Sequence, residues 1–273
     1  MPLTTTVRRA ARTAGNSRSL ETLTRLGLVG YGVLHLAVAW LALQIANGRP
    51  AAEGDQSGAF QLLAAQPLGR ILVWAIAVGL LAMSVWQLFE AAVGHTDERA
   101  GRRVVERVVS AGRVVVYAAL AWTAFKVVNG DGASNVEQQR HATSGLLGNT
   151  GGPWLVGVIG VLVTVVGLVI AGYGISKGFE RRLKRGQMSG RALKAAVLTG
   201  QVGYAVKGAA YAVVGVLLVV AAASFDPKKS TGLDGALRTL SAQPFGYALL
   251  VVVAAGFAVF GVYCFFQSRY RKV

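Results

Sequence analysis

Six long apolar runs dominate the pattern of hydrophobic and polar positions along the 273 residues. They lie at residues 25–46, 69–93, 104–128, 153–178, 199–223 and 245–267. Each run has the roughly 20 residues that a helix needs to cross a hydrocarbon core about 30 Å thick. Because no water satisfies backbone groups there, such runs fold as helices. The pattern therefore predicts an all-α membrane protein with six transmembrane helices.

The six runs recur as three similar pairs. An offset of 82 residues aligns Trp40 with Trp122, and an offset of 94 aligns Tyr117 with Tyr211. The segment Gln-Pro-x-Gly at residues 66–69 returns at residues 243–246. Each pair crosses the membrane twice, so all three have the same orientation. This predicts three parallel two-helix repeats about a pseudo-threefold axis along the membrane normal.

The repeats divide the chain into units. We expect repeat 1 at residues 23–98, repeat 2 at 99–182 and repeat 3, with a basic C-terminus, at 199–273. Residues 1–22 are basic and lack apolar periodicity, which is typical of a flexible tail. Residues 183–198 are predicted to form a basic linker.

The loops that follow the first and fifth runs share a second pattern. A short amphipathic helix is expected there, with Ser57 or Asp234 as its N-cap. Pro67 and Pro244 suit the first turn of the next span, where a missing N–H costs nothing. The middle repeat has residues 148–153 instead, without Gln-Pro, so a different shape is expected.

Composition agrees with a membrane protein. Hydrophobic residues make up 53% and charged residues only 15%, against about 25% charged in soluble domains. The 35 glycines are abundant. Those of the first and fourth runs recur at helical spacing, which favours close helix packing over a phosphate loop. They are Gly27, Gly30, Gly157, Gly160 and Gly167. The single Cys264 excludes an intramolecular disulfide.

The net charge of +16 is unevenly distributed. Nineteen Lys and Arg residues lie on the side of the tail, residues 94–107, residues 177–194 and the C-terminus, against six on the other side. This bias places both termini in the cytoplasm and the chain in the plasma membrane. No separate basic module exists, which argues against nucleic-acid binding. The basic face instead favours anionic lipids as partners.

Polar side chains recur at one place in the odd-numbered runs. Arg113 and Lys207 align with Tyr31, and one turn later His35 aligns with Tyr117 and Tyr211. A spacing of four residues puts each pair on one helix face. Tyr117 and Tyr211 are expected to lie over the two cations, by cation–π contact or a hydroxyl hydrogen bond. The candidate binding residues are Tyr31, His35, Arg113, Tyr117, Lys207 and Tyr211.

Two interpretations of these residues stay open. A charge within a membrane span costs about 2.5–3.5 kcal/mol, so Arg113 and Lys207 are candidates for an electropositive site for an anion or lipid headgroup. Alternatively, both snorkel to the cytoplasmic interface and serve only the structure. No Asp or Glu of the sequence lies at comparable depth; Glu90 and Glu180 lie near cytoplasmic ends.

Signals of catalysis are absent from the sequence. There is no G-x-S-x-G or Ser-x-x-Lys motif, so we expect no enzyme and no catalytic residue. His35 is separated from His95 and His141, which lie on opposite sides of the membrane, so no metal site or cofactor is expected.

The repeat pattern resembles a known family. Arg-x-Gly-Tyr-x-x-(Lys/Arg)-Gly-x-x-Tyr followed by Gln-Pro-Phe-Gly is similar to uncharacterised three-repeat, six-span membrane proteins common in high-GC Gram-positive bacteria. The third repeat fits from Gly203 to Gly246, with Gln201 in the arginine place, and the resemblance covers about residues 23–270. It implies the fold and no activity. The residues themselves favour a binding or transport scaffold for an anionic or amphipathic solute or lipid. The alternative is an accessory subunit that packs against a larger membrane complex.

Overall fold

The computed structural model describes residues 18–49, 52–94, 100–131 and 134–271. This part of the chain is all-α, and six of its helices are long and apolar enough to cross a membrane. The prediction of six apolar spans is confirmed. The six are α2 (Arg18–Ala46), α4 (Gly69–Val93), α5 (Ala100–Asn129), α7 (Gly152–Ile175), α8 (Gly190–Ala223) and α10 (Gly246–Tyr270).

Two helices begin earlier than the apolar pattern indicates. α2 begins at Arg18, so the last five residues of the predicted tail are helical, while residues 1–17 lie outside the described residues. α8 begins at Gly190, inside the predicted linker, because Ser189 caps it by accepting from Ala192 N at 3.3 Å. Hydropathy marks the apolar part of a helix, whereas a cap marks its true start.

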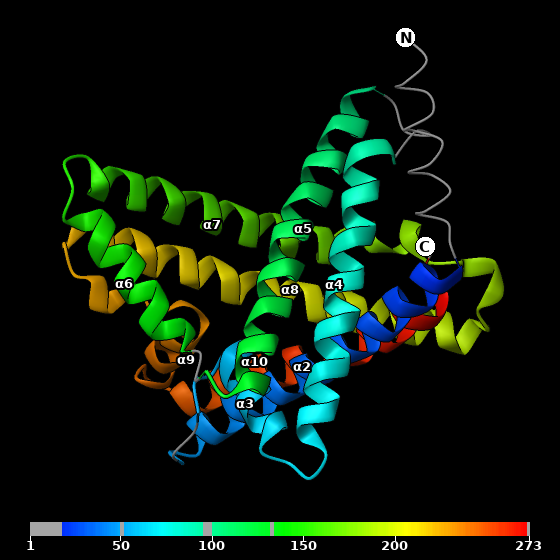
Figure 1. Cartoon of the computed structure of the whole chain (residues 1–273), viewed down its shortest axis with the longest axis horizontal. Helices are drawn as coiled ribbons and strands as arrows, with labels where there is room; N and C mark the ends of the chain where they lie inside the picture. The colour runs from blue at the N-terminus through cyan, green and yellow to red at the C-terminus, as the bar shows by residue number, and fades with distance from the viewer. Residues whose placement is uncertain (1–17, 50–51, 95–99, 132–133, 272–273) are drawn as a thin grey trace.

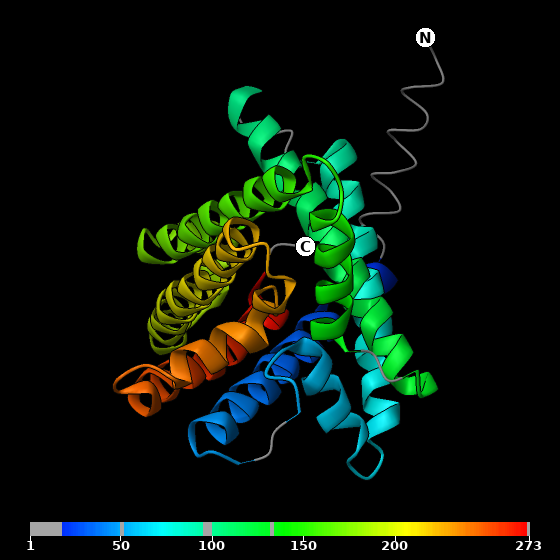
Figure 2. The same cartoon turned by 90° about the vertical axis from the view of Figure 1, so that its left-hand side faces the viewer.

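The long helices pack most closely in three pairs, α4 with α5, α7 with α8 and α10 with α2. Each joins the second helix of one predicted repeat to the first helix of another. Figures 1 and 2 show the three pairs as arms steeply inclined to one another. Further contacts join α2 to α4 and α8 to α10, but α5 and α7, the long helices of the middle repeat, hardly touch within the described residues.

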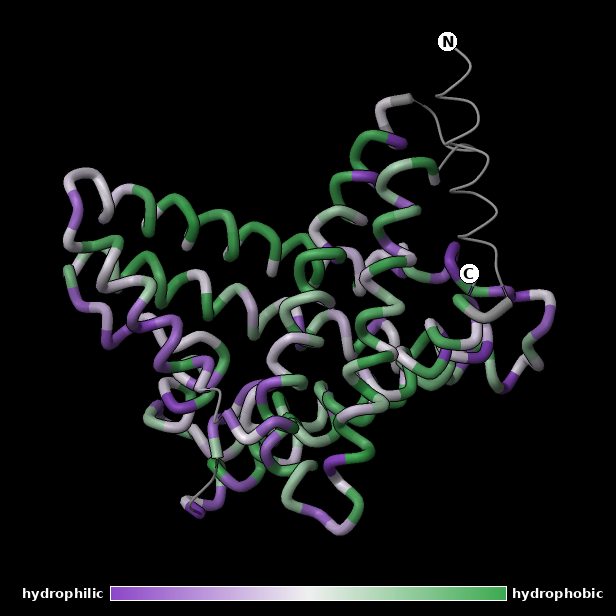
Figure 3. Tube along the Cα trace, viewed as in Figure 1, coloured by the Kyte–Doolittle hydropathy of each residue, from purple (hydrophilic) through white to green (hydrophobic). Residues whose placement is uncertain are grey.

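Glycines bring the paired backbones together. A Cβ at Gly167 of α7 would lie 2.4 Å from Ala212 N of α8, and one at Gly208 would lie 2.4 Å from Ala171 N. Between α2 and α4, a Cβ at Gly27 would lie 2.4 Å from Gly79 O. The predicted packing role is confirmed for Gly27, Gly30, Gly160 and Gly167, whereas Gly157 has only an ordinary contact at 3.7 Å. Apart from these glycines α7 is hydrophobic along nearly its whole length (Figure 3).

A short helix precedes the second long helix of every repeat: α3 (Gln56–Ala64), α6 (Asn135–Leu147) and α9 (Gly232–Ser241). The predicted caps are wrong. Asp55 caps α3, and Asp234 lies inside α9, where its Oδ1 accepts from Gly54 N at 2.7 Å. The middle repeat, for which another shape is expected, also has its helix, capped by Ser134. Most residues of α6 are polar, so the apolar pattern does not reveal it.

The turn after each short helix is the same in all three repeats. The residue before the long helix takes a left-handed conformation, at Leu68, Gly151 and Phe245. Pro67 and Pro244 therefore precede the N-cap, and the prediction that they lie in the first helical turn is wrong. The next residue is always glycine, because a Cβ at position 69, 152 or 246 would lie about 2 Å from a carbonyl oxygen of the short helix.

The short helices interlock at one end of the bundle, named here the cap end. Glu53 accepts from Ser134 Oγ and from Asn135 N (3.0 Å), and Thr143 Oγ1 lies 2.7 Å from Ser230 Oγ. At the opposite end, named the terminal end, Arg25 Nη1 donates to Arg269 O at 2.8 Å, which ties α2 to α10. Lys184 N donates to Tyr270 O there at 2.7 Å.

The glycine contacts generate a stability prediction. Gly167→Ala forces α7 and α8 apart, so we expect the free energy of unfolding in detergent to fall by about 1–3 kcal/mol. Gly172→Ala on the same helix is the matched control, because a Cβ there meets no atom within 4 Å. It should leave stability equal or raise it by up to about 1 kcal/mol through helix propensity. Equal losses in both variants would contradict this account of the packing.

Candidate functional site

The six candidate residues lie on the first long helix of each repeat. Tyr31 and His35 are on α2, Arg113 and Tyr117 on α5, and Lys207 and Tyr211 on α8. Direct contacts join five of them into one cluster around Tyr31. Arg113 lies one turn from Tyr117 and faces a second group of residues nearer the terminal end. The structure therefore brings the predicted residues together in two adjoining places.

Lys207 lies inside the bundle, with 7% of its surface exposed. Its Nζ donates to Tyr31 Oη at 2.7 Å and to His35 Nε2 at 3.1 Å. The same nitrogen lies 4.1 Å from the centre of the Phe260 ring. An ammonium has three donors, and these contacts account for all three. Lys207 thus does not snorkel, whereas a purely structural role is compatible with these contacts.

The cation–π partner predicted for Lys207 is not its nearest one. Tyr211 is 5.8 Å from Nζ, whereas the rings of Phe260 and Tyr31 lie at 4.1 Å and 4.8 Å. Phe260 belongs to α10, and a phenylalanine within an apolar run carries no signal that separates it from other lipid-facing or core residues. A desolvated cation–π contact contributes about 2 kcal/mol, so these rings stabilise the buried ammonium.

The hydrogen bonds of His35 determine its tautomer. Nδ1 lies 2.8 Å from the carbonyl oxygen of Tyr31, one turn earlier on α2. Since a carbonyl only accepts, Nδ1 carries the hydrogen and Nε2 has the free lone pair. Nε2 therefore accepts from Lys207 and His35 is neutral. A histidine at this place gives the ammonium a polar partner without neutralising its charge.

The two remaining tyrosines extend the cluster. The Tyr117 ring lies edge-on to the Tyr31 ring, with centroids 5.6 Å apart, and so reaches across from α5 to α2. Gln56 Nε2, in the first turn of α3, lies 3.5 Å from Tyr211 Oη. The cap end therefore covers the cluster on one side. Gln56 is a further residue that the repeat alignment does not single out.

Arg113 differs from Lys207 in having an unused donor. The residue is half-buried, but its Nη1 is shielded from solvent and has no hydrogen-bond partner in the part of the chain that the structure describes. Arg182 and Arg271 come from two segments that meet at the terminal end, where Leu183 bridges to Arg271. Arg182 pairs with Glu106 at 2.6 Å, and Arg271 lies over the Trp86 ring at 4.7 Å. From the sequence alone, Arg182 and Arg271 count only among the basic residues beside the membrane.

Carboxylates are scarce around both cations. None of the ion pairs found among the described residues involves Lys207 or Arg113. In the same part of the chain, no three His, Cys, Asp or Glu side chains gather closely enough to hold a metal ion. The cluster can thus bind an anion or hold aromatic side chains around a cation.

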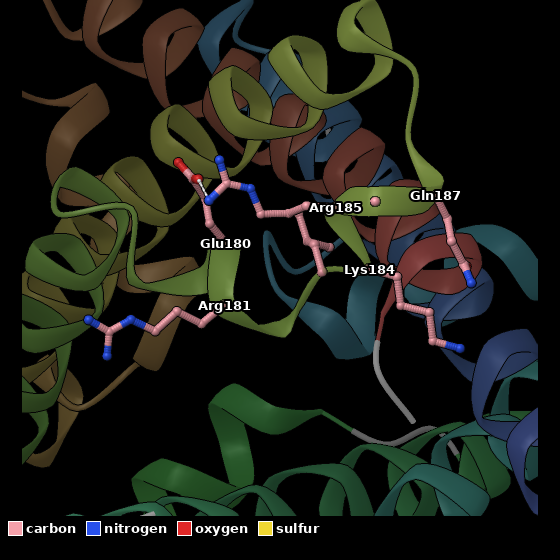
Figure 4. Close-up of a pocket in the computed structure, with 7 residues that line it drawn as sticks. Glu180, Arg181, Lys184, Arg185 and Gln187 are labelled. Atoms are coloured by element: carbon pink, nitrogen blue, oxygen red, sulfur yellow. Dashed lines mark ion pairs between the residues drawn. The ribbon is translucent and has the colours of Figure 1, made fainter.

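An open cavity of about 330 Å³ lies at the terminal end, between α7 and α8. Figure 4 shows Glu180 paired with Arg185, with Arg181 pointing away from both and Lys184 and Gln187 on the far side. The Glu180–Arg185 distance is 3.3 Å. None of the six candidate residues lines this cavity.

Comparison with known proteins identifies relatives without an assigned activity. The sequence matches the family described as Domain of Unknown Function (DUF1206) at residues 26–94, 108–180 and 202–271. Each segment contains two long helices, which confirms the internal repeats. An uncharacterised protein of Bacillus subtilis (strain 168), YxxB, is 28% identical over 252 residues, covering 91% of this chain and 90% of that protein. No solved structure matches.

The cap end generates a pH prediction through Asp55, which lies outside the long helices. Its Oδ1 accepts from Ser57 N at 2.8 Å and Gly58 N at 3.1 Å. Burial raises the pKa of Asp55 from 3.8 to about 6 despite these bonds. The folded protein thus binds this proton more tightly than the unfolded chain. Stability from this group is present below about pH 4 and is lost as the pH rises through about 6.

We expect Asp55→Asn to remove this pH dependence, because the amide keeps the capping oxygen and cannot ionise. Relative to the native chain it should gain up to about 3 kcal/mol at pH 7.5, which corresponds to the shift of about two pKa units. Asp55→Ala should lose about 1 kcal/mol at low pH through the missing cap. Thermal unfolding in detergent between pH 4 and 7.5 measures both. Parallel pH curves for Asp55→Asn and the native chain would contradict the assignment.

Proposed function

Because this chain belongs to the DUF1206 family of multi-pass membrane proteins, we propose that it is a binding or transport scaffold for an anionic or amphipathic solute or lipid. The observation that supports this is the state of Lys207. Its amine lies within the bundle, and its two polar partners, Tyr31 and His35, are both uncharged groups. Arg113 adds a second cation with an unused buried donor.

An anion would compensate these charges. At an effective dielectric constant of about 20, two opposite unit charges about 6 Å apart attract by about 3 kcal/mol. That is comparable to the cost of about 2.5–3.5 kcal/mol for placing one cation within a membrane span. Lys207 then contributes positive potential, since its donors are occupied, and Arg113 contributes hydrogen bonds. Polar residues kept at this depth are typical of a binding or transport pathway.

The arrangement in the membrane is part of the proposal. The chain lies in the plasma membrane, with both termini in the cytoplasm. The three repeats are related by a pseudo-threefold axis along the membrane normal. Two observations support this. The excess of basic residues is on the terminal end. The close pairs α4–α5, α7–α8 and α10–α2 repeat one contact between successive repeats. Anionic lipids of the cytoplasmic leaflet are the partners we propose.

A second candidate function has its own observation. α5 and α7 are the least buried of the six long helices and expose apolar side chains along their length. An accessory subunit that packs against another membrane protein would use such faces. In that case the cations only anchor helices, and Lys207→Met would leave ligand binding unchanged because there is none to lose.

Lys207→Met tests the proposed function. We expect dioctanoyl phosphatidic acid to raise the melting temperature of the native protein in neutral detergent, because a ligand that binds only the folded state stabilises it. In Lys207→Met the affinity should fall at least tenfold, because the buried positive charge is gone. Dioctanoyl phosphatidylcholine should have little effect on either protein.

Lys126→Met is the matched control for this experiment. It removes a lysine from another long helix, where Nζ lies 5.8 Å from the Trp122 ring and away from the cluster. The ligand-induced shift should survive in that variant. No shift in the native protein, or equal shifts in all three proteins, would contradict the proposed function.

The topology has a separate test. Reporter enzymes that are active only outside the cytoplasm should be inactive when fused after Val273 and active when inserted at residues 129–152. A cytoplasmic reporter should give the opposite result. Activity of the extracytoplasmic reporter at the C-terminus would reverse the proposed orientation.

A further inference from the structure

The guanidinium of Arg113 is incompletely hydrogen-bonded. Its Nη1 is shielded from solvent and has no hydrogen-bond partner among the described residues. A buried donor left without an acceptor costs about 1–3 kcal/mol, and more when it is charged. Tyr117, the nearest of the predicted partners, leaves Nη1 unpaired. The arrangement therefore lacks an acceptor that is compatible with positive charge.

Two more arginines surround the same place. Arg182 follows α7, and Arg271 ends α10 with only 4% of its surface exposed. The backbone holds them together, because Leu183 forms an isolated antiparallel bridge with Arg271. Glu106 is the carboxylate paired with Arg182, and none of the ion pairs found among the described residues involves Arg113 or Arg271. Planar guanidinium forks suit the oxygens of a phosphate group.

The depth of this group suits a lipid headgroup. The apolar span of α5 begins at Arg103, ten residues before Arg113, which is about 15 Å along the helix axis. The Arg113 side chain leans back toward the start of the helix. Arg182 and Arg271 lie at the terminal end, just beyond their helices. The guanidinium groups thus meet between the bilayer core and its surface.

Within the described residues α5 and α7 hardly touch, and the separation between them is named here the opening. α5 packs mainly on α4 and α7 mainly on α8. Val109 and Val116, one turn before and one turn after Arg113, are 40% and 49% exposed. On α7, Ile159 and Val166 are also exposed, beside the face that packs on α8. α6 links the cap ends of the two helices (Figure 1).

We propose that Arg113, Arg182 and Arg271 bind the phosphate of an anionic phospholipid whose acyl chains lie between α5 and α7. This rests on the proposed function and names its ligand and its route of entry. The excess positive charge selects an anionic headgroup over a zwitterionic one. The apolar valines and isoleucine beside Arg113 favour a lipid over a free anion, because a water-soluble anion gains nothing from them. The lipid acyl chains also fill the gap that α5 and α7 leave.

The first test counts lipids on the purified protein. The protein is reconstituted in nanodiscs of phosphatidylcholine with one fifth phosphatidylglycerol, and native mass spectrometry measures the lipid retained after release. We expect one phosphatidylglycerol on the native protein and at least tenfold less on Arg113→Met. Arg271→Gln gives a second reading of the same group if Arg113→Met does not fold. Arg181→Gln is the control, since it removes an exposed neighbouring charge.

The second test concerns the acyl chains. Val116→Trp fills the opening beside Arg113 and should lower the retained phosphatidylglycerol about tenfold. Val115→Trp is the matched control, since Val115 is 68% exposed on another side of α5, and it should change nothing. Inorganic phosphate at 10 mM should displace little of the lipid. Complete displacement by phosphate with no effect of Val116→Trp would show a site for a free anion and overturn the lipid proposal.

The outcomes separate this inference from the proposed function. If Arg113→Met and Arg271→Gln retain phosphatidylglycerol like the native protein, the arginine site is wrong. The phosphatidic-acid shift that depends on Lys207 can still stand in that case, which would place the anion at the central cluster. A stable dimer that excludes lipid from the α5–α7 opening would also overturn the proposal, in favour of a second copy as the occupant.

Discussion

Close backbone contact through glycine is the constraint on which this structure depends. In a bilayer the apolar side chains gain little by leaving lipid, so helices associate through packing and hydrogen bonds. The pairs α7–α8 and α2–α4 approach so closely that no Cβ fits at Gly167, Gly208 or Gly27. The pair α4–α5 packs closely without such a glycine contact, whereas α5 and α7 hardly touch within the described residues. Glycines therefore set the approach of α7 to α8 and of α2 to α4, and the α4–α5 arm depends on its side chains.

The two interior basic residues have different surroundings. Lys207 is enclosed by Tyr31, His35 and Phe260, and its Nζ donates to the first two. Arg113 has a buried Nη1 that finds no partner among the described residues. The two residues align at the same position of the repeat, so the difference comes from the helices that surround them.

Differences among the three repeats allow Lys207 to pair with Tyr31. Three cations at one repeated position would repel one another. Tyr31 stands where the other repeats have Arg113 and Lys207, and its hydroxyl accepts from Lys207 at 2.7 Å. The middle repeat replaces the Leu68 and Phe245 of the other turns by Gly151, which takes the left-handed conformation without strain. The same turn is thereby retained although its Gln-Pro signal is lost.

The sequence by itself determined the properties that depend on composition and on neighbours along the chain. Apolar length and spacing predict the six helices, the three repeats, the packing glycines and five of the clustered residues, because the bilayer imposes both on any spanning segment. Tertiary structure decided the rest. Asp55 rather than Ser57 caps α3, Phe260 covers Lys207, and Arg182 and Arg271 approach Arg113 from segments about 70 and 160 residues away. Side-chain contacts between distant helices depend on helix rotation and inclination, and hydropathy carries no record of either.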